Sequence, residues 1–343
     1  MDVFRPDLTE RAAGEQNAPE RRLPPATQRL PHVVAMVVGI GAALLVSVGG
    51  GPAALWGKTT GLFSTHQNFA TTLSESDLDH QKPQKQAEIL LERAVSRSNG
   101  ATGQVESEIG TEIEAQIEAR IDAWRGQLKW DSQLGDLTTV ALNSSDRSVR
   151  ASAVEVQLAA YGLTKSASTV DALVRQASSR DHTQKIWALW ALGLLGNRGV
   201  DTDRVVQVLA AQLQMKDSGK DSNRHNDVAG NTNTSEDARS WAVEGLALVG
   251  TTPTIAPLLD AMRNDPSAAV RERAACSLAR AGMLSHQQRL IAVPQLINYA
   301  SDPALDAQTQ AWAFQALANI TKQSLPNDSA AWRNWYQNSN SGN

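Results

Sequence analysis

Residue types that could carry catalysis or bind a metal are few and scattered in this sequence. The stretch DSGKDSN (217–223) is acidic but does not fit the twelve-residue calcium loop. No G-x-S-x-G, phosphate-binding-loop or G-x-G-x-x-G motif occurs. The histidines do not pair with another histidine, cysteine or aspartate at metal-ligand spacing on one face: His32, His66, His80, His182, His225 and His286. We therefore expect no catalytic residue, no cofactor-binding residue and no metal ligand.

The single cysteine and the balance of charge restrict the chemistry further. Cys276 excludes an intramolecular disulfide. It stands among Ala274, Ala275 and Leu278, which predicts a small buried apolar residue; a reactive thiol is the alternative. The formal net charge is −4, and no region is basic enough to indicate a phosphate-binding surface, so we expect no nucleic-acid partner.

The strongest regularity is a repeat. Five copies share an anchor position followed by alanine three residues later, with leucine seven and glycine eleven residues later in most copies. Successive anchors are 35, 54, 32 and 39 residues apart, and the long interval contains a polar insertion (216–235). Gln157 replaces the leucine in the first copy, and Thr321 replaces the glycine in the last. The anchors are Arg150, Lys185, Arg239, Arg271 and Gln310.

A shorter apolar stretch lies between each pair of copies, so each unit is predicted to consist of two helices. Aspartates stand where the first helix of a unit should begin, and a carboxylate there caps the exposed N–H groups: Asp146, Asp181, Asp265 and Asp302. Pro266 and Pro303 are expected at the first helical position, and the glycines to end helices with positive φ. The anchor arginine is expected to reach a capping aspartate of the adjacent unit.

The pattern D-x-x-V-R-x-x-A-x-x-x-L-x-x-x-G, followed by a second amphipathic helix, resembles HEAT repeats. It is most similar to the short, alanine-rich bacterial kind called HEAT-like or phycobilisome-lyase-type repeats, and it matches best at 238–250 and 270–282. The resemblance implies an all-α fold, a right-handed α-solenoid of helix pairs over 131–322, whose concave face commonly binds other proteins. A helix over 325–338, with Trp332 and Trp335, is expected to cap the last unit, with a free aromatic recognition site as the alternative.

Three tryptophans share one offset, two residues after the anchor: Trp187, Trp241 and Trp312. They are expected either to pack between units or to form a protein-binding stripe on one face of the solenoid.

The N-terminal part differs in character. Residues 1–31 are rich in proline and charge and predict a disordered cytoplasmic tail. Residues 32–56 carry no ionised side chain and are long enough for a transmembrane helix, with a cleaved secretory signal or a buried helix as the alternatives. Five arginines precede this segment and Lys58 follows it, so the positive-inside rule places the N-terminus in the cytoplasm and the repeats outside, in a periplasmic or extracellular location.

Residues 57–82 are predicted to be a flexible tether, and 83–129 to form amphipathic helices. Isoleucines recur every four residues from Ile109 and lead into Trp124. The opposite face is expected to be solvated and carries four glutamates: Glu108, Glu112, Glu114 and Glu118. The Ile109–Trp124 stripe is expected to pack on the first repeat or to pair two chains as a homodimer.

These features predict a non-catalytic, membrane-anchored scaffold that binds a protein or peptide on its solenoid surface. The alternative is an accessory or lyase-like component of an enzyme system, which the lyase-type relatives suggest. Those relatives attach bilins to cysteines in the cytoplasm, whereas this domain is expected to face outward.

Overall fold

The computed structural model describes residues 75–98, 104–144, 146–215 and 234–340, and over these residues the protein is all-helical, without a strand. The predicted tail (1–31), membrane-spanning segment (32–56) and polar insertion up to residue 233 lie outside the described residues. No helix in the described ranges combines the length and the apolar composition needed to cross a membrane.

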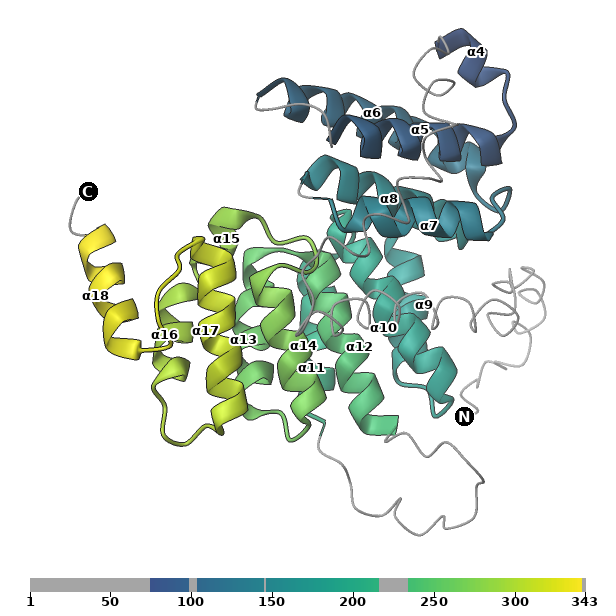
Figure 1. Cartoon of the computed structure of the whole chain (residues 1–343). Helices are drawn as coiled ribbons and strands as arrows, with labels where there is room; N and C mark the ends of the chain where they lie inside the picture. The colour runs from purple at the N-terminus through teal and green to yellow at the C-terminus, as the bar shows by residue number, and fades with distance from the viewer. Residues whose placement is uncertain (1–74, 99–103, 145, 216–233, 341–343) are drawn as a thin grey trace, which may run out of the picture.

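The first helices form a group of their own, drawn in blue in Figure 1. Helix α5 packs on α6 and α7, and α6 packs along α8. This group consists of α4 (Glu75–Asp79), α5 (Pro83–Ser98), α6 (Gln104–Trp124), α7 (Ser132–Leu142) and α8 (Arg147–Ala160).

Helix α4 lies inside the segment 57–82, which was predicted to be a flexible tether. That prediction is wrong for Glu75–Asp79, which form a helix. Leu78 of α4 is fully buried. The Gln86 side chain donates to the carbonyl of Leu78 at 3.1 Å and to that of Gln81 at 3.0 Å. One buried leucine and these hydrogen bonds fix the short helix on α5.

The remaining helices continue as stacked pairs. The predicted first helices are α8, α10, α12, α14 and α17, and α10, α12, α14 and α17 pack each on the next (Figure 1). The bounds are α9 (Ala167–Ala177), α10 (His182–Asn197), α11 (Thr202–Leu213), α12 (Thr234–Val249), the 3₁₀ turn η3 (Thr252–Thr254), α13 (Ile255–Asn264), α14 (Ala268–Ala279), α15 (His286–Leu290), α16 (Val293–Ala300), α17 (Ala307–Thr321) and α18 (Ser329–Asn340).

The repeat positions explain the stacking. All the alanines three residues after an anchor, and all the leucines seven residues after, are completely buried, as predicted: Ala153, Ala188, Ala242, Ala274, Ala313, Leu192, Leu246, Leu278 and Leu317. The single second helix expected after α14, in the unit anchored at Arg271, is instead two helices, α15 and α16. A capping box between Ser285 and Gln288 starts α15, and Pro294 stands in the first turn of α16.

Half of the predicted helix caps are confirmed. Asp146 caps α8 and Asp181 caps α10 through side-chain oxygens that accept backbone N–H groups. The other two predictions are wrong by a few residues, because Asp265-Pro266 and Asp302-Pro303 form turns before the helix begins. Ser267 caps α14, and Asp306 caps α17.

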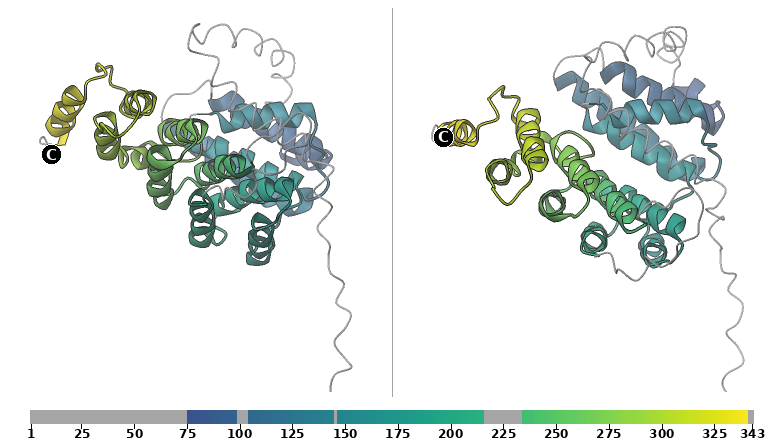
Figure 2. Two further views of the ribbon diagram at one scale, coloured as in Figure 1. Left: turned by 90° about the horizontal axis from the view of Figure 1, so that it is seen from below. Right: turned by 60° about the horizontal axis from the view of Figure 1, so that its bottom comes forward.

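Two hydrophobic cores meet at α8. Val149, Ala153 and Val156 belong to the core shared with α5–α7. Ala151, Val154 and Leu158, on the other side of the same helix, belong to the core that continues to Trp332. Figure 2 shows the two helix groups joined in this region, with α18 at the far end. Helix α8 is therefore buried on both sides.

Helix α18 closes the second core, as predicted for 325–338. Trp332 is 1% exposed, its Nε1 donates to the carbonyl of Pro326 at 3.0 Å, and it packs edge-on against Trp335. The α18 helix packs on α16.

Candidate binding groove

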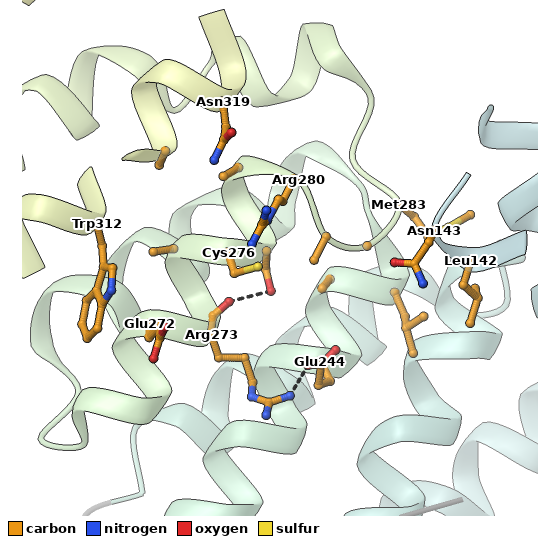
Figure 3. Close-up of a pocket in the computed structure, with 18 of the residues that line it drawn as sticks. Leu142, Asn143, Glu244, Glu272, Arg273, Cys276, Arg280, Met283, Trp312 and Asn319 are labelled. Atoms are coloured by element: carbon orange, nitrogen blue, oxygen red, sulfur yellow. Dashed lines mark hydrogen bonds and ion pairs between the residues drawn. The ribbon is translucent and has the colours of Figure 1, made fainter. Parts of the chain in front are cut away.

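A groove with a volume of about 630 Å³ runs across the first helices of the units (Figure 3). Figure 3 shows Trp312 and Glu272 at one side, Leu142 and Asn143 at the other, and Cys276 and Arg280 between them. Its lining side chains come from the end of α7 and from α8, α10, α12, α14 and α17. Because these helices belong to successive units, the groove follows from the stacking itself.

One face of α14 supplies the floor of the groove. Glu272, Arg273, Cys276 and Arg280 all line it, since positions three, four, seven and eight apart lie close together on a helix. Cys276 is half-buried and lies in this row, so the prediction of a fully buried cysteine is wrong. Ala274 is completely buried and does not line the groove, whereas Cys276 lines it beside Ala275.

The charges in the groove are unevenly paired. Arg273 forms an ion pair with Glu244 of α12 (Figure 3). The Arg280 side chain is exposed and forms no ion pair with the described residues. Arg150 also lines the groove, so arginines outnumber the glutamates Glu244 and Glu272. The groove therefore offers a free cation at Arg280.

The end of the groove near α8 is lined by buried polar and aromatic side chains. Arg150, Gln157 and Trp190 line it and are 9%, 4% and 3% exposed. Arg150 donates to the carbonyl of Ser144 at 2.7 Å, and burial lowers the pKa of its guanidinium. The side-chain oxygen of Gln157 is buried without a hydrogen-bond partner in the described structure.

A second buried arginine, Arg289 of α15, supports this end. It donates to the carbonyls of Ser277 and Leu278 at 2.8 Å each, and so caps the C-terminal end of α14. Burial, together with the nearby charge of Arg150, lowers the pKa of Arg289 to about 10. The sequence signal for this role, an arginine inside an apolar stretch, is too general to have identified it.

The three tryptophans of the predicted stripe do not share one environment. All are half-buried, but among them Trp312 alone lines the groove. Trp187 packs against Tyr161 and Trp190, with ring centroids 5.1 and 5.2 Å apart. Trp241 lies on α12 and packs on the core.

The predicted contact between anchor and neighbouring aspartate occurs twice. Arg239 binds Asp265 with an Nε–Oδ2 distance of 2.8 Å, and both side chains are 2% exposed. Arg271 reaches Asp306 at 3.2 Å rather than Asp302, because Asp306 is the residue that caps the next helix. Lys185 is half-buried.

A cluster of charges around the buried Glu155 joins the two helix groups. Glu155 of α8 is fully buried and contacts Arg198 at 2.5 Å and Lys165 at 3.2 Å. Arg198 also binds Glu114 at 2.9 Å, and Lys165 binds Glu118 at 2.7 Å. The expectation that Glu114 and Glu118 of α6 face only solvent is therefore wrong.

These contacts shift the pKa values of the cluster. Burial opposes the charge on Lys165, but its hydrogen bond with Glu118 and the charge of Glu155 outweigh that effect and raise its pKa. The hydrogen bond from Lys165 lowers the pKa of Glu118.

The isoleucine stripe of α6 packs inside the chain. Ile113, Ile117, Ile121 and Trp124 are at most 3% exposed and belong to the core shared with α8. This is the first of the two expected arrangements, and it leaves these four side chains covered rather than available to a second copy. The Ile109 side chain lies outside the described residues.

Among the described residues, no group of three or more histidine, cysteine or carboxylate side chains could hold a metal ion. Comparison with protein-family models finds no match for the chain, and comparison with curated proteins finds none either.

Proposed function

We propose that the protein is a non-catalytic scaffold of HEAT-like repeats, wound as a right-handed solenoid, whose groove binds an extended peptide segment of a partner protein. The observation that carries this proposal is the groove itself, which crosses successive repeat units and so offers one continuous binding surface.

The chemistry of the lining favours a peptide over other ligands. Trp312 and Leu142 offer apolar surface at opposite sides of the groove, whereas Arg280 is an exposed cation that forms no ion pair with the described residues. Aromatic side chains and arginines are the residues that most often dominate peptide and protein binding. A segment that alternates apolar and polar groups and places a carboxylate near Arg280 complements this surface.

Peptide selection tests the proposal. The purified full chain is used to select ligands from a displayed library of random twelve-residue peptides, and their affinities are measured by fluorescence anisotropy. Trp312→Ala is expected to weaken binding at least about tenfold, since it removes an aromatic anchor. Arg280→Glu is expected to lower the affinity of peptides that carry a carboxylate and to leave the affinity of other peptides unchanged.

Trp241→Ala is the matched control, because Trp241 occupies the same repeat offset and is also half-buried but does not line the groove. Selection of no peptide, or of peptides that bind Trp312→Ala and Trp241→Ala equally, would contradict the proposal.

We further propose that residues 32–56 anchor the chain in a membrane with the repeats outside the cytoplasm. The support is the uncharged segment and the arginines before it. Alkaline phosphatase, which is active only outside the bacterial cytoplasm, is expected to be active when fused after residue 343 and inactive when fused after residue 31. The opposite pattern would reverse the orientation, and activity at neither site would argue against export.

The alternative of a lyase-like enzyme component draws no specific support from the groove, whose lining includes two glutamates and no histidine among the described residues.

A further inference from the structure

Gln157 is the place where the first repeat departs from its own pattern. The other four copies have leucine at this position, and all four leucines are completely buried. Gln157 is nearly as buried, at 4% exposed, yet it carries a polar carboxamide. A polar group in a position built for leucine lowers stability unless its hydrogen bonds are formed.

The side-chain oxygen of Gln157 lacks such a hydrogen bond among the described residues. This Oε1 atom is itself buried. Uncharged side chains elsewhere share this condition, at Gln176, Asn197 and Thr251, but none of these three lines the groove. Gln157 thus combines a buried unpaired acceptor with a position facing the groove.

We propose that Gln157 is a ligand-binding residue whose carboxamide pairs with a main-chain peptide group of the segment bound in the groove. The inference rests on the proposed function and adds the contact that selects a peptide backbone. Trp190 and Met283, which line the same groove, would pack against the side chain next to that peptide group.

A peptide group fits this site better than a carboxylate or an apolar side chain does. The Gln157 oxygen requires a donor, which a carboxylate lacks and an apolar side chain lacks as well. A peptide group has one N–H and one C=O, so it satisfies a carboxamide in either orientation of the amide. A binding residue that costs stability in the free protein is a common feature of functional sites.

The test compares stability with binding. Gln157→Leu restores the repeat pattern and is expected to raise the melting temperature by about 2–4 °C. It is also expected to lower the affinity for the selected peptides about three- to tenfold, because the hydrogen bond to the ligand is lost. Gln157→Met repeats the comparison with an unbranched side chain, in case leucine packs poorly.

Gln176→Leu is the matched control, because it removes another glutamine with an unpaired buried oxygen, on α9 and away from the groove. It is expected to leave peptide affinity unchanged.

N-methylation of the peptide identifies the donor. Each backbone N–H of a selected peptide is methylated in turn, and one position is expected to weaken binding to the wild type while having little further effect on Gln157→Leu. Unchanged affinity in both Gln157 variants, or methylation penalties that are the same in wild type and Gln157→Leu, would overturn the inference and leave the dependence on Trp312 standing. If no peptide depends on Trp312, the proposed function and this inference fail together.

Discussion

At the scale of single residues, the buried pair Arg239–Asp265 is the clearest link between two repeat units. Asp265 also accepts the N–H of Ser267 at 2.9 Å, and Arg239 also donates to Ser235 at 2.8 Å. Each of the two charged side chains therefore forms a further hydrogen bond in addition to the ion pair. Removal of either partner would leave the other charge buried without compensation.

We expect Arg239→Met and Asp265→Asn each to lower the free energy of unfolding by about 3–5 kcal/mol. The double variant should lose much less than the sum, because it removes both charges. Urea unfolding of the four proteins measures this coupling. As a control, Arg204→Met breaks the exposed pair with Asp171 and should cost far less than either buried-pair variant. Strictly additive losses at Arg239 and Asp265 would show that the pair is not coupled.

Glu118 contributes to the pH dependence of stability. Because its pKa in the folded protein lies below the ordinary value of 4.5, the contact with Lys165 stabilises the fold above that value and is lost as the pH falls through the lowered pKa. The melting temperature of the wild type should therefore fall more steeply below about pH 4.5 than that of Glu118→Gln. Parallel melting curves for the two proteins at acid pH would refute this.

At the scale of helices, α10 and α12 approach unusually closely at two glycines. A Cβ on Gly193 would lie 2.7 Å from the Cα of Gly245, and one on Gly245 would lie 2.7 Å from the carbonyl oxygen of Leu189. Backbone atoms cannot give way as side chains do. The contact therefore depends on both residues lacking a side chain.

Gly245→Ala should destabilise the protein by about 1–3 kcal/mol through this overlap, although alanine favours a helix over glycine by about 1 kcal/mol. Thermal unfolding with circular dichroism measures the net effect. An increase in melting temperature would mean that the two helices separate without loss.

The helices themselves were largely predictable, because alanine, leucine and capping residues recur at fixed offsets and their burial follows from stacking. Asp265 and Asp302 were misplaced as caps since local sequence does not decide between a turn and the first helical residue. Gln157 was visible as a departure from the pattern. Its unpaired oxygen and the groove beside it depend on how α8 meets α10 and α14, which a single sequence does not encode locally.

At the scale of the whole molecule, the presence of two hydrophobic cores predicts that the two ends of the protein can differ in local stability. Each unit contacts its neighbours, so damage at one end should stay near that end. Trp332→Ala removes the aromatic lid of the last unit and should cost about 3–5 kcal/mol. Hydrogen exchange should then rise in α16 and α17 and stay unchanged in α5 and α6. Faster exchange throughout the molecule would indicate a single cooperative unit.

The half-buried position of Cys276 has a practical consequence. Because the chain contains no other thiol, a small maleimide dye would attach at one defined atom, in the middle of the groove floor. Its emission would respond directly to whatever displaces solvent there. The molecule thus carries its own attachment point for an optical reporter of occupancy.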